Sequence, residues 1–129
     1  MKIGIDIGGT LSKYPDFFRW LISSLNKENI FILTDMSDKN KVLSMLNENN
    51  INVISDNVYC CDYLNHGENC KAVIIKKLGI DVLIDDHMGY LMSADIPIRL
   101  FIMPNPSLPY YADNWNCDSE QFGRIKGSP

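Results

Sequence analysis

Residues 71–87 read KAVIIKKLGIDVLIDDH and predict a helix followed directly by a buried strand. A helix is predicted over about 70–78, because Gly79 stands where a glycine commonly ends a helix. The apolar run 82–84 predicts a buried strand that ends directly in Asp85 and Asp86. A helix that leads into an apolar strand is the repeating unit of a parallel α/β sheet.

The same alternation of elements extends over most of the chain. Further strands are predicted at 2–7, 30–33, 51–54 and 98–102, with one more extended piece at 58–61. Helices are predicted from Pro15, from a cap at Ser37 or Asp38, and after Asp86. We therefore expect one Rossmann-like three-layer α/β domain over 1–129, with a parallel sheet of about five strands. Its core should span about 2–103, and 104–129 should form an irregular tail.

Composition sets limits on partners and location. The 129 residues suffice for one domain, and a net charge of −4 argues against a dedicated nucleic-acid surface. Asp6 interrupts the N-terminal segment before the apolar region of a signal peptide could form, and no membrane span is expected. We expect a cytoplasmic protein without a membrane partner.

The four cysteines are Cys60, Cys61, Cys70 and Cys117. Reduced thiols are expected, because this is not a small secreted chain. Cys61, His66 and Cys70 loosely match a zinc-binding run, but the usual close cysteine pair is missing, so packed core cysteines are favoured.

Polar residues follow three of the predicted strands. They are Asp6, Gly8, Gly9 and Thr10 after the first, Thr34 and Asp35 after the second, and Asp85 and Asp86 after the fourth. Ligands bind at the carboxyl ends of strands in open parallel sheets, so these groups should converge. Clustered carboxylates require a cation, and Mg²⁺ prefers oxygen ligands. A hydroxyl and an ammonium, from Thr34 and Lys71, suit phosphoryl oxygens.

Three motifs resemble those of the haloacid-dehalogenase-like (HAD-like) superfamily: GIDIGGTL at 4–11, FILTD at 31–35, and KAVIIKKLGIDVLIDDH at 71–87. The spacing is similar to that of the 5′-nucleotidase-like subgroup. The resemblance implies a Mg²⁺-dependent phosphatase that forms an aspartyl-phosphate on Asp6. It places the metal on Asp6, Asp85, Asp86 and the carbonyl of Gly8. It places the phosphoryl group on Gly9, Thr10, Thr34, Asp35 and Lys71, with Asp6, Thr34 and Lys71 as catalytic residues.

One position departs from the family pattern. Gly8 replaces the aspartate that serves as acid and base in the family. His87, Asp35 or Tyr14 could supply a proton instead. The alternative is a catalytically impaired regulatory protein that retains the metal and phosphate pocket.

The intervals between the strands leave no room for a cap domain. By analogy with the family, an uncapped site favours a bulky phosphorylated substrate, such as a protein or nucleic-acid end, or a nucleotide. A homo-oligomer could also cover the site. Tyr110, Tyr111 and Trp115 could stack on a base, although packing of the tail against the sheet is favoured.

Two other resemblances are weaker. MKIGIDIGGT also resembles the phosphate-binding opening of sugar kinases and actin-like ATPases, but a helical pattern follows from Pro15, and the chain is too short for two lobes. A receiver domain would place its acidic pair after the first strand, whereas Asp85 and Asp86 follow the fourth.

Overall fold

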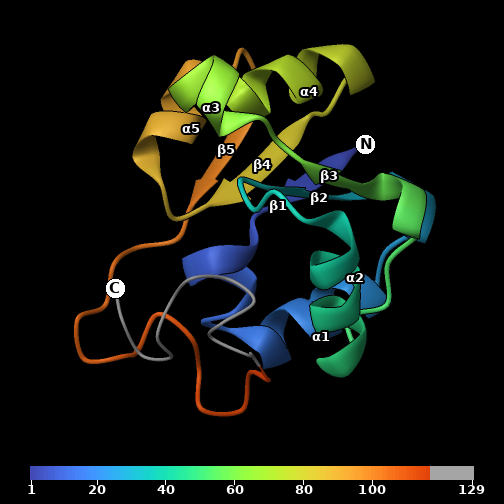
Figure 1. Cartoon of the computed structure of the whole chain (residues 1–129), viewed down its shortest axis with the longest axis vertical. Coiled ribbons are helices and arrows are strands. Elements are labelled where there is room, and N and C mark those ends of the chain that lie inside the picture. The colour runs from blue at the N-terminus through green and yellow to red at the C-terminus, as the bar shows by residue number, and fades with distance from the viewer. Residues whose placement is uncertain (117–129) are drawn as a thin grey trace.

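The computed structural model describes residues 1–116 (Figure 1). The strands are β1 (Ile3–Ile5), β2 (Ile30–Thr34), β3 (Val58–Cys60), β4 (Val82–Asp85) and β5 (Ile98–Phe101). The helices are α1 (Pro15–Ser23), α2 (Lys39–Glu48), α3 (Tyr63–His66), α4 (Cys70–Leu78) and α5 (Met88–Ser93). Short helical turns lie at Ile7–Leu11, Lys27–Asn29, Ser55–Asn57 and Gly67–Asn69.

The strands form one sheet in the order β3-β2-β1-β4-β5, and every neighbouring pair is parallel. The predicted small Rossmann-like α/β domain with five parallel strands is therefore confirmed. The chain moves outward from β1 to β3, then crosses back to β4 on the other side of β1. This reversal makes the gap between β1 and β4 the switch point, where ligands bind in sheets of this type.

Helices cover both faces of the sheet, as Figure 1 shows. In β2, Ile30 and Ile32 point into the core shared with α1 and α2, whereas Phe31 and Leu33 point into the core shared with α4 and α5. Successive side chains of a strand alternate between faces, so a strand that is buried on both faces must be apolar throughout.

Local signals explain where the helices begin and end. Pro15 occupies the first turn of α1, where its missing N–H costs nothing. The side chain of Asp38 accepts a hydrogen bond of 3.2 Å from the amide of Lys41 and caps α2. Gly79 ends α4 in the left-handed conformation, with φ of 69°. These helices match the predicted ones.

One predicted strand is wrong. Residues 51–54 form no ladder, and the third strand is β3 at 58–60. The amide of Ile51 donates to the carbonyl of Leu46 at 2.9 Å, so this segment leaves α2 by a turn of its own. The chain becomes a strand only where Val58 lies opposite Ile32 of β2. An apolar run does not by itself identify which segment will have a partner strand.

Within the described residues the tail, 104–116, is irregular as predicted, but part of it belongs to the core. Tyr111 and Trp115 are fully buried against the face that α1 and α2 cover, so the core extends beyond residue 103. The amide of Ala112 donates to the carbonyl of Ser12 at 2.8 Å and fixes the tail there. The favoured prediction that these aromatic residues pack against the sheet is confirmed for Tyr111 and Trp115. Cys117 lies outside the described residues.

Among residues 1–116, no helix has the length and apolar character needed to cross a membrane.

Candidate functional site

Three carboxylates meet at the switch point of the sheet. Asp6 follows β1, Asp85 ends β4 and Asp86 comes next. β1 and β4 pair side by side with Ile5 opposite Ile84, so the residues that follow lie at the same edge. Ligand oxygens of the three aspartates lie within 4.8 Å of one another. Within residues 1–116 this is the one cluster of acidic, histidine or cysteine side chains able to hold an ion.

Lys71 lies in the first turn of α4 and is fully buried beneath this carboxylate cluster. Its Nζ lies 2.7 Å from Oδ1 of Asp6 and 2.6 Å from Oδ2 of Asp85. It also lies 4.5 Å from the centre of the Tyr90 ring. Burial opposes the charge, but the two carboxylates outweigh it, so the pKa of Lys71 is raised and the ammonium persists.

The pKa values of two carboxyls show an excess of negative charge. Burial, and then the charge of Asp6, raise the pKa of Asp85 to about 7 and that of Asp86 to about 8. One ammonium therefore does not offset three ionised aspartates. A divalent cation would favour the ionised forms of Asp85 and Asp86 at neutral pH, and carboxylate oxygens suit a hard ion such as Mg²⁺. The donor set thus fits Mg²⁺ without being specific to it.

Thr10 bridges the cluster from the turn after β1. Its Oγ1 lies 3.1 Å from Oδ2 of Asp6 and 3.5 Å from Oδ1 of Asp86. The amide of Gly9, which we expected to contact a phosphoryl group, donates instead to Oγ of Ser12 at 2.9 Å. The turn therefore contributes a hydroxyl to the site, while the Gly9 amide holds the turn in shape.

Thr34 and Asp35, the two residues after the second predicted strand that were expected to bind a phosphoryl group, differ in their position relative to the carboxylate cluster. Thr34 is buried at the edge of the sheet that carries Asp6, and its Oγ1 accepts from the amide of Met36 at 3.2 Å. The carboxylate of Asp35 does not belong to the carboxylate cluster. It accepts a hydrogen bond of 2.8 Å from the hydroxyl of Tyr90 instead. Burial, and then Asp35, raise the pKa of that tyrosine.

Tyr110 lies directly over the glycine pair, which the sequence did not predict. A Cβ at Gly8 would lie 2.6 Å from the Tyr110 hydroxyl oxygen, and one at Gly9 would lie 2.1 Å from Oδ2 of Asp86. Gly9 also has φ of 76°, which favours glycine. Oγ of Ser12 donates to the Tyr110 carbonyl at 3.1 Å. Both glycines are thus required by space, and no sequence spacing connects them to residue 110.

His87 and Tyr14, the two other residues that could supply a proton, have partners or neighbours outside the carboxylate cluster. Nε2 of His87 lies 2.7 Å from Oε2 of Glu68, in a pair that is about half exposed. Tyr14 packs against the core of α1 and α2.

The cysteines behave as core residues. Cys61 and Cys70 are buried in the core that α4 and α5 cover, and burial raises the pKa of Cys61 to about 12. Cys60, Cys61 and Cys70 are free thiols. With His66 they form no group close enough to hold an ion in the described part of the chain, so the disfavoured zinc hypothesis gains no support.

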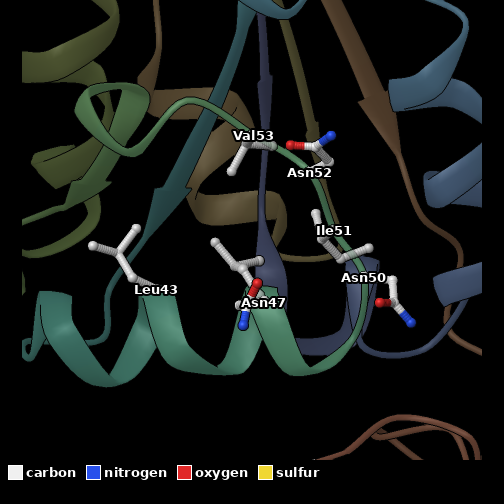
Figure 2. Close-up of a pocket in the computed structure, with 7 residues that line it drawn as sticks. Leu43, Asn47, Asn50, Ile51, Asn52 and Val53 are labelled. Atoms are coloured by element: carbon white, nitrogen blue, oxygen red, sulfur yellow. The ribbon is translucent and has the colours of Figure 1, made fainter.

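Two cavities differ in their chemistry. One, of about 590 Å³, is bordered by Gly9, Asp86 and Tyr110 and so adjoins the carboxylate cluster. The other, of about 530 Å³, lies between α2 and the segment after it (Figure 2). Its polar side chains are Asn47, Asn50 and Asn52, and it has no charged or nucleophilic side chain. Of these two cavities in the described part of the chain, the first is the one that can present a ligand to the carboxylates.

No family model matches the chain, no curated protein matches it and no solved structure matches it. The arrangement of side chains therefore carries the functional argument.

Proposed function

We propose that this chain is a HAD-like, Mg²⁺-dependent phosphatase that hydrolyses phosphomonoesters through an aspartyl-phosphate on Asp6. One observation carries the proposal: Asp6, Asp85 and Asp86 converge around the buried ammonium of Lys71 at the switch point of a parallel sheet. A structural ion pair would need one carboxylate for one ammonium. Two further carboxylates, with raised pKa values, suggest a place for a cation and a phosphoryl group.

In this proposal Asp6, Asp86 and the carbonyl of Gly8 would hold Mg²⁺. Asp85, whose two oxygens contact Lys71 and the amide of His87, would add its negative charge beside the ion and hold Lys71 in place. When bound, the ion would offset charge on the carboxylates and on the phosphoryl oxygens. Lys71 fixes Oδ1 of Asp6 by its 2.7 Å contact and keeps the nucleophile oriented. Thr34, buried at the adjacent strand end, offers a hydroxyl to a phosphoryl oxygen.

The reaction proceeds by two displacements at phosphorus. A carboxylate oxygen of Asp6 bonds to phosphorus while the bond to the ester oxygen breaks, and the departing alkoxide takes up a proton. Water then bonds to phosphorus and loses a proton, while the bond to Asp6 breaks. The products are an alcohol and inorganic phosphate, and Asp6 is regenerated.

A second candidate is a metal- and phosphate-binding regulatory protein with little turnover. The contact between Tyr110 and Gly8 favours it, because a tyrosine hydroxyl occupies the space that an acidic side chain at position 8 would need. General acid–base help contributes about 10²–10⁴ in rate, so its loss could leave binding without useful catalysis.

Hydrolysis of p-nitrophenyl phosphate tests the proposal, because its leaving group needs little protonation. We expect turnover with Mg²⁺, none with EDTA, and none in Asp6→Asn. Asp56→Asn, a change of an exposed aspartate in the turn before β3, should retain the activity. Mg²⁺ binding without turnover, at any concentration of this ester, would favour the regulatory protein.

A further inference from the structure

The cavity beside Asp86 has mainly apolar walls. Six of the side chains that line it are apolar or aromatic: Ile102, Met103, Pro104, Pro106, Leu108 and Tyr110. One end is formed by Gly9 and Asp86, so the cavity begins at the carboxylate cluster. A ligand with its phosphoryl group at Asp6 would therefore extend the rest of its structure between these walls.

Hydrogen bonds at three points hold this wall in place. The amide of Ile102 donates to the carbonyl of Asp85 at 2.9 Å, which fixes the start of the segment beside the cluster. Nζ of Lys13 donates to the carbonyl of Asn105 at 3.3 Å. The carbonyl of Tyr110 accepts from Ser12 at 3.1 Å. The walls are thus hydrogen-bonded to the end of β4, which carries Asp85, and to the residues that follow the turn after Asp6.

Apolar side chains at this cavity remain exposed in the folded chain. Met103 is 69% exposed and Leu108 is 42% exposed, although both line the cavity. Exposed apolar surface that adjoins a site marks a place where an apolar ligand would gain from burial. The charged side chains on the walls are Asp86 and Lys13, and the ammonium of Lys13 is already engaged by Asn105.

We propose that this cavity binds the alcohol portion of a small phosphomonoester whose leaving group is uncharged and largely apolar, of about one or two rings. This inference rests on the proposed function, because it places the phosphoryl group at Asp6. The volume of about 590 Å³ lies within the ~300–1,000 Å³ of small-molecule sites. The apolar walls disfavour the charged backbone of a nucleic-acid end. The proposed substrate is therefore a small molecule, unlike the bulky phosphorylated substrate that the absence of a cap domain led us to expect.

The test compares methyl, butyl and benzyl phosphates, whose reacting oxygens are all carried by a saturated carbon. We expect kcat/KM to rise along the series, by roughly 10-fold or more from methyl to benzyl. Met103→Gln should lower the benzyl-to-methyl ratio several-fold. Met92→Gln is the matched control, because Met92 on α5 is 67% exposed and lies outside the cavity. It should leave the ratio unchanged.

A binding measurement separates failure of this inference from failure of the proposed function. Calorimetry in the presence of Mg²⁺ compares the affinities of benzylphosphonate and methylphosphonate. Neither compound can be hydrolysed, because a carbon atom replaces the ester oxygen in both. Tighter binding of benzylphosphonate, weakened by Met103→Gln, supports the cavity even if no ester is turned over. Turnover without any preference for benzyl overturns the inference and leaves the phosphatase standing. Faster turnover of a 5′-phosphorylated oligonucleotide than of benzyl phosphate also overturns it, as does equal binding of the two phosphonates.

Discussion

The hydroxyl oxygen of Tyr110 lies 2.6 Å from the point at which a side chain on Gly8 would begin. That separation is about the distance between the Cβ and the carboxylate oxygens within an aspartate. Tyr110 and an acidic residue at position 8 therefore compete for one space. The glycine is explained by the packing of the tail onto the first turn.

Gly8→Asp should destabilise the protein. The new side chain would overlap the Tyr110 ring, and overpacking of this kind costs about 1–3 kcal/mol. Urea unfolding of Gly8→Asp measures this loss. The same change in a Tyr110→Ala background should cost clearly less, because the space is then open. An equal cost in both backgrounds would show that Tyr110 is not the obstacle.

Lys71→Met should strongly destabilise the protein at pH 8. It leaves Asp6 and Asp85 buried without their cation, and loss of one partner from a buried ion pair costs about 3–5 kcal/mol. Urea unfolding without metal is the measurement. Lys76→Met changes an exposed lysine on the same helix and should have little effect. Similar losses in the two variants would argue against the buried charge network.

The metal-free protein should lose stability as the pH rises. The carboxyls of Asp85 and Asp86 have an ordinary pKa of 3.8 and folded pKa values of about 7 and about 8. Between these limits the folded state binds more protons than the unfolded state, so the free energy of unfolding falls with rising pH. Unfolding in EDTA between pH 5 and 8 should show this fall.

Mg²⁺ should reverse most of that loss, because the cation replaces the protons. Its stabilising effect should be larger at pH 8 than at pH 5. Asp86→Asn removes one of the two titrating groups and should flatten the dependence in EDTA. A stability in EDTA that rises from pH 5 to 8, in the wild type, would contradict the raised pKa values.

Asp86→Asn and Asp85→Asn should affect different properties. Oδ2 of Asp85 contacts Lys71 at 2.6 Å and Oδ1 accepts from the amide of His87 at 3.0 Å, so both its oxygens have partners. Asp86 faces the cavity. We expect Asp86→Asn to weaken Mg²⁺ binding about 10-fold or more, with a smaller loss of stability. We expect Asp85→Asn mainly to destabilise the fold. Calorimetric titration with Mg²⁺ and urea unfolding of both variants are the measurements. Weaker Mg²⁺ binding in Asp85→Asn than in Asp86→Asn, or a larger loss of stability in Asp86→Asn, would contradict the prediction.

Much of this arrangement could be predicted from local sequence. The glycine at 79, the cap at Asp38 and the proline at 15 are local signals, and the predicted helices agree with the structure. Asp6, Asp85 and Asp86 were predicted to converge because strand ends share one edge of a parallel sheet. Residues 51–54 were predicted wrongly, because pairing with β2 depends on register rather than on apolar character.

The features that sequence could not provide depend on long-range contacts. Tyr110 lies over Gly8 in a tail whose Tyr111 and Trp115 are buried in the core that α1 and α2 cover. No spacing along the chain encodes that contact. The Asp35 carboxylate follows the expected motif but contacts Tyr90 of α5, whose position depends on the packing of another layer. The cavity next to Asp86 likewise brings Gly9 and Lys13 together with seven residues between Ile102 and Tyr110.

The proposed function depends most directly on Asp6 acting as the nucleophile in a Mg²⁺-dependent phosphoryl site. Fluorine NMR with beryllofluoride tests it without a known substrate, because this anion mimics a phosphoryl group on a carboxylate. We predict bound fluorine resonances in the wild type with Mg²⁺, and their loss with EDTA and in Asp6→Asn. Wild-type protein that shows no bound resonance at saturating Mg²⁺ and beryllofluoride, or an Asp6→Asn variant that keeps it, would contradict the claim.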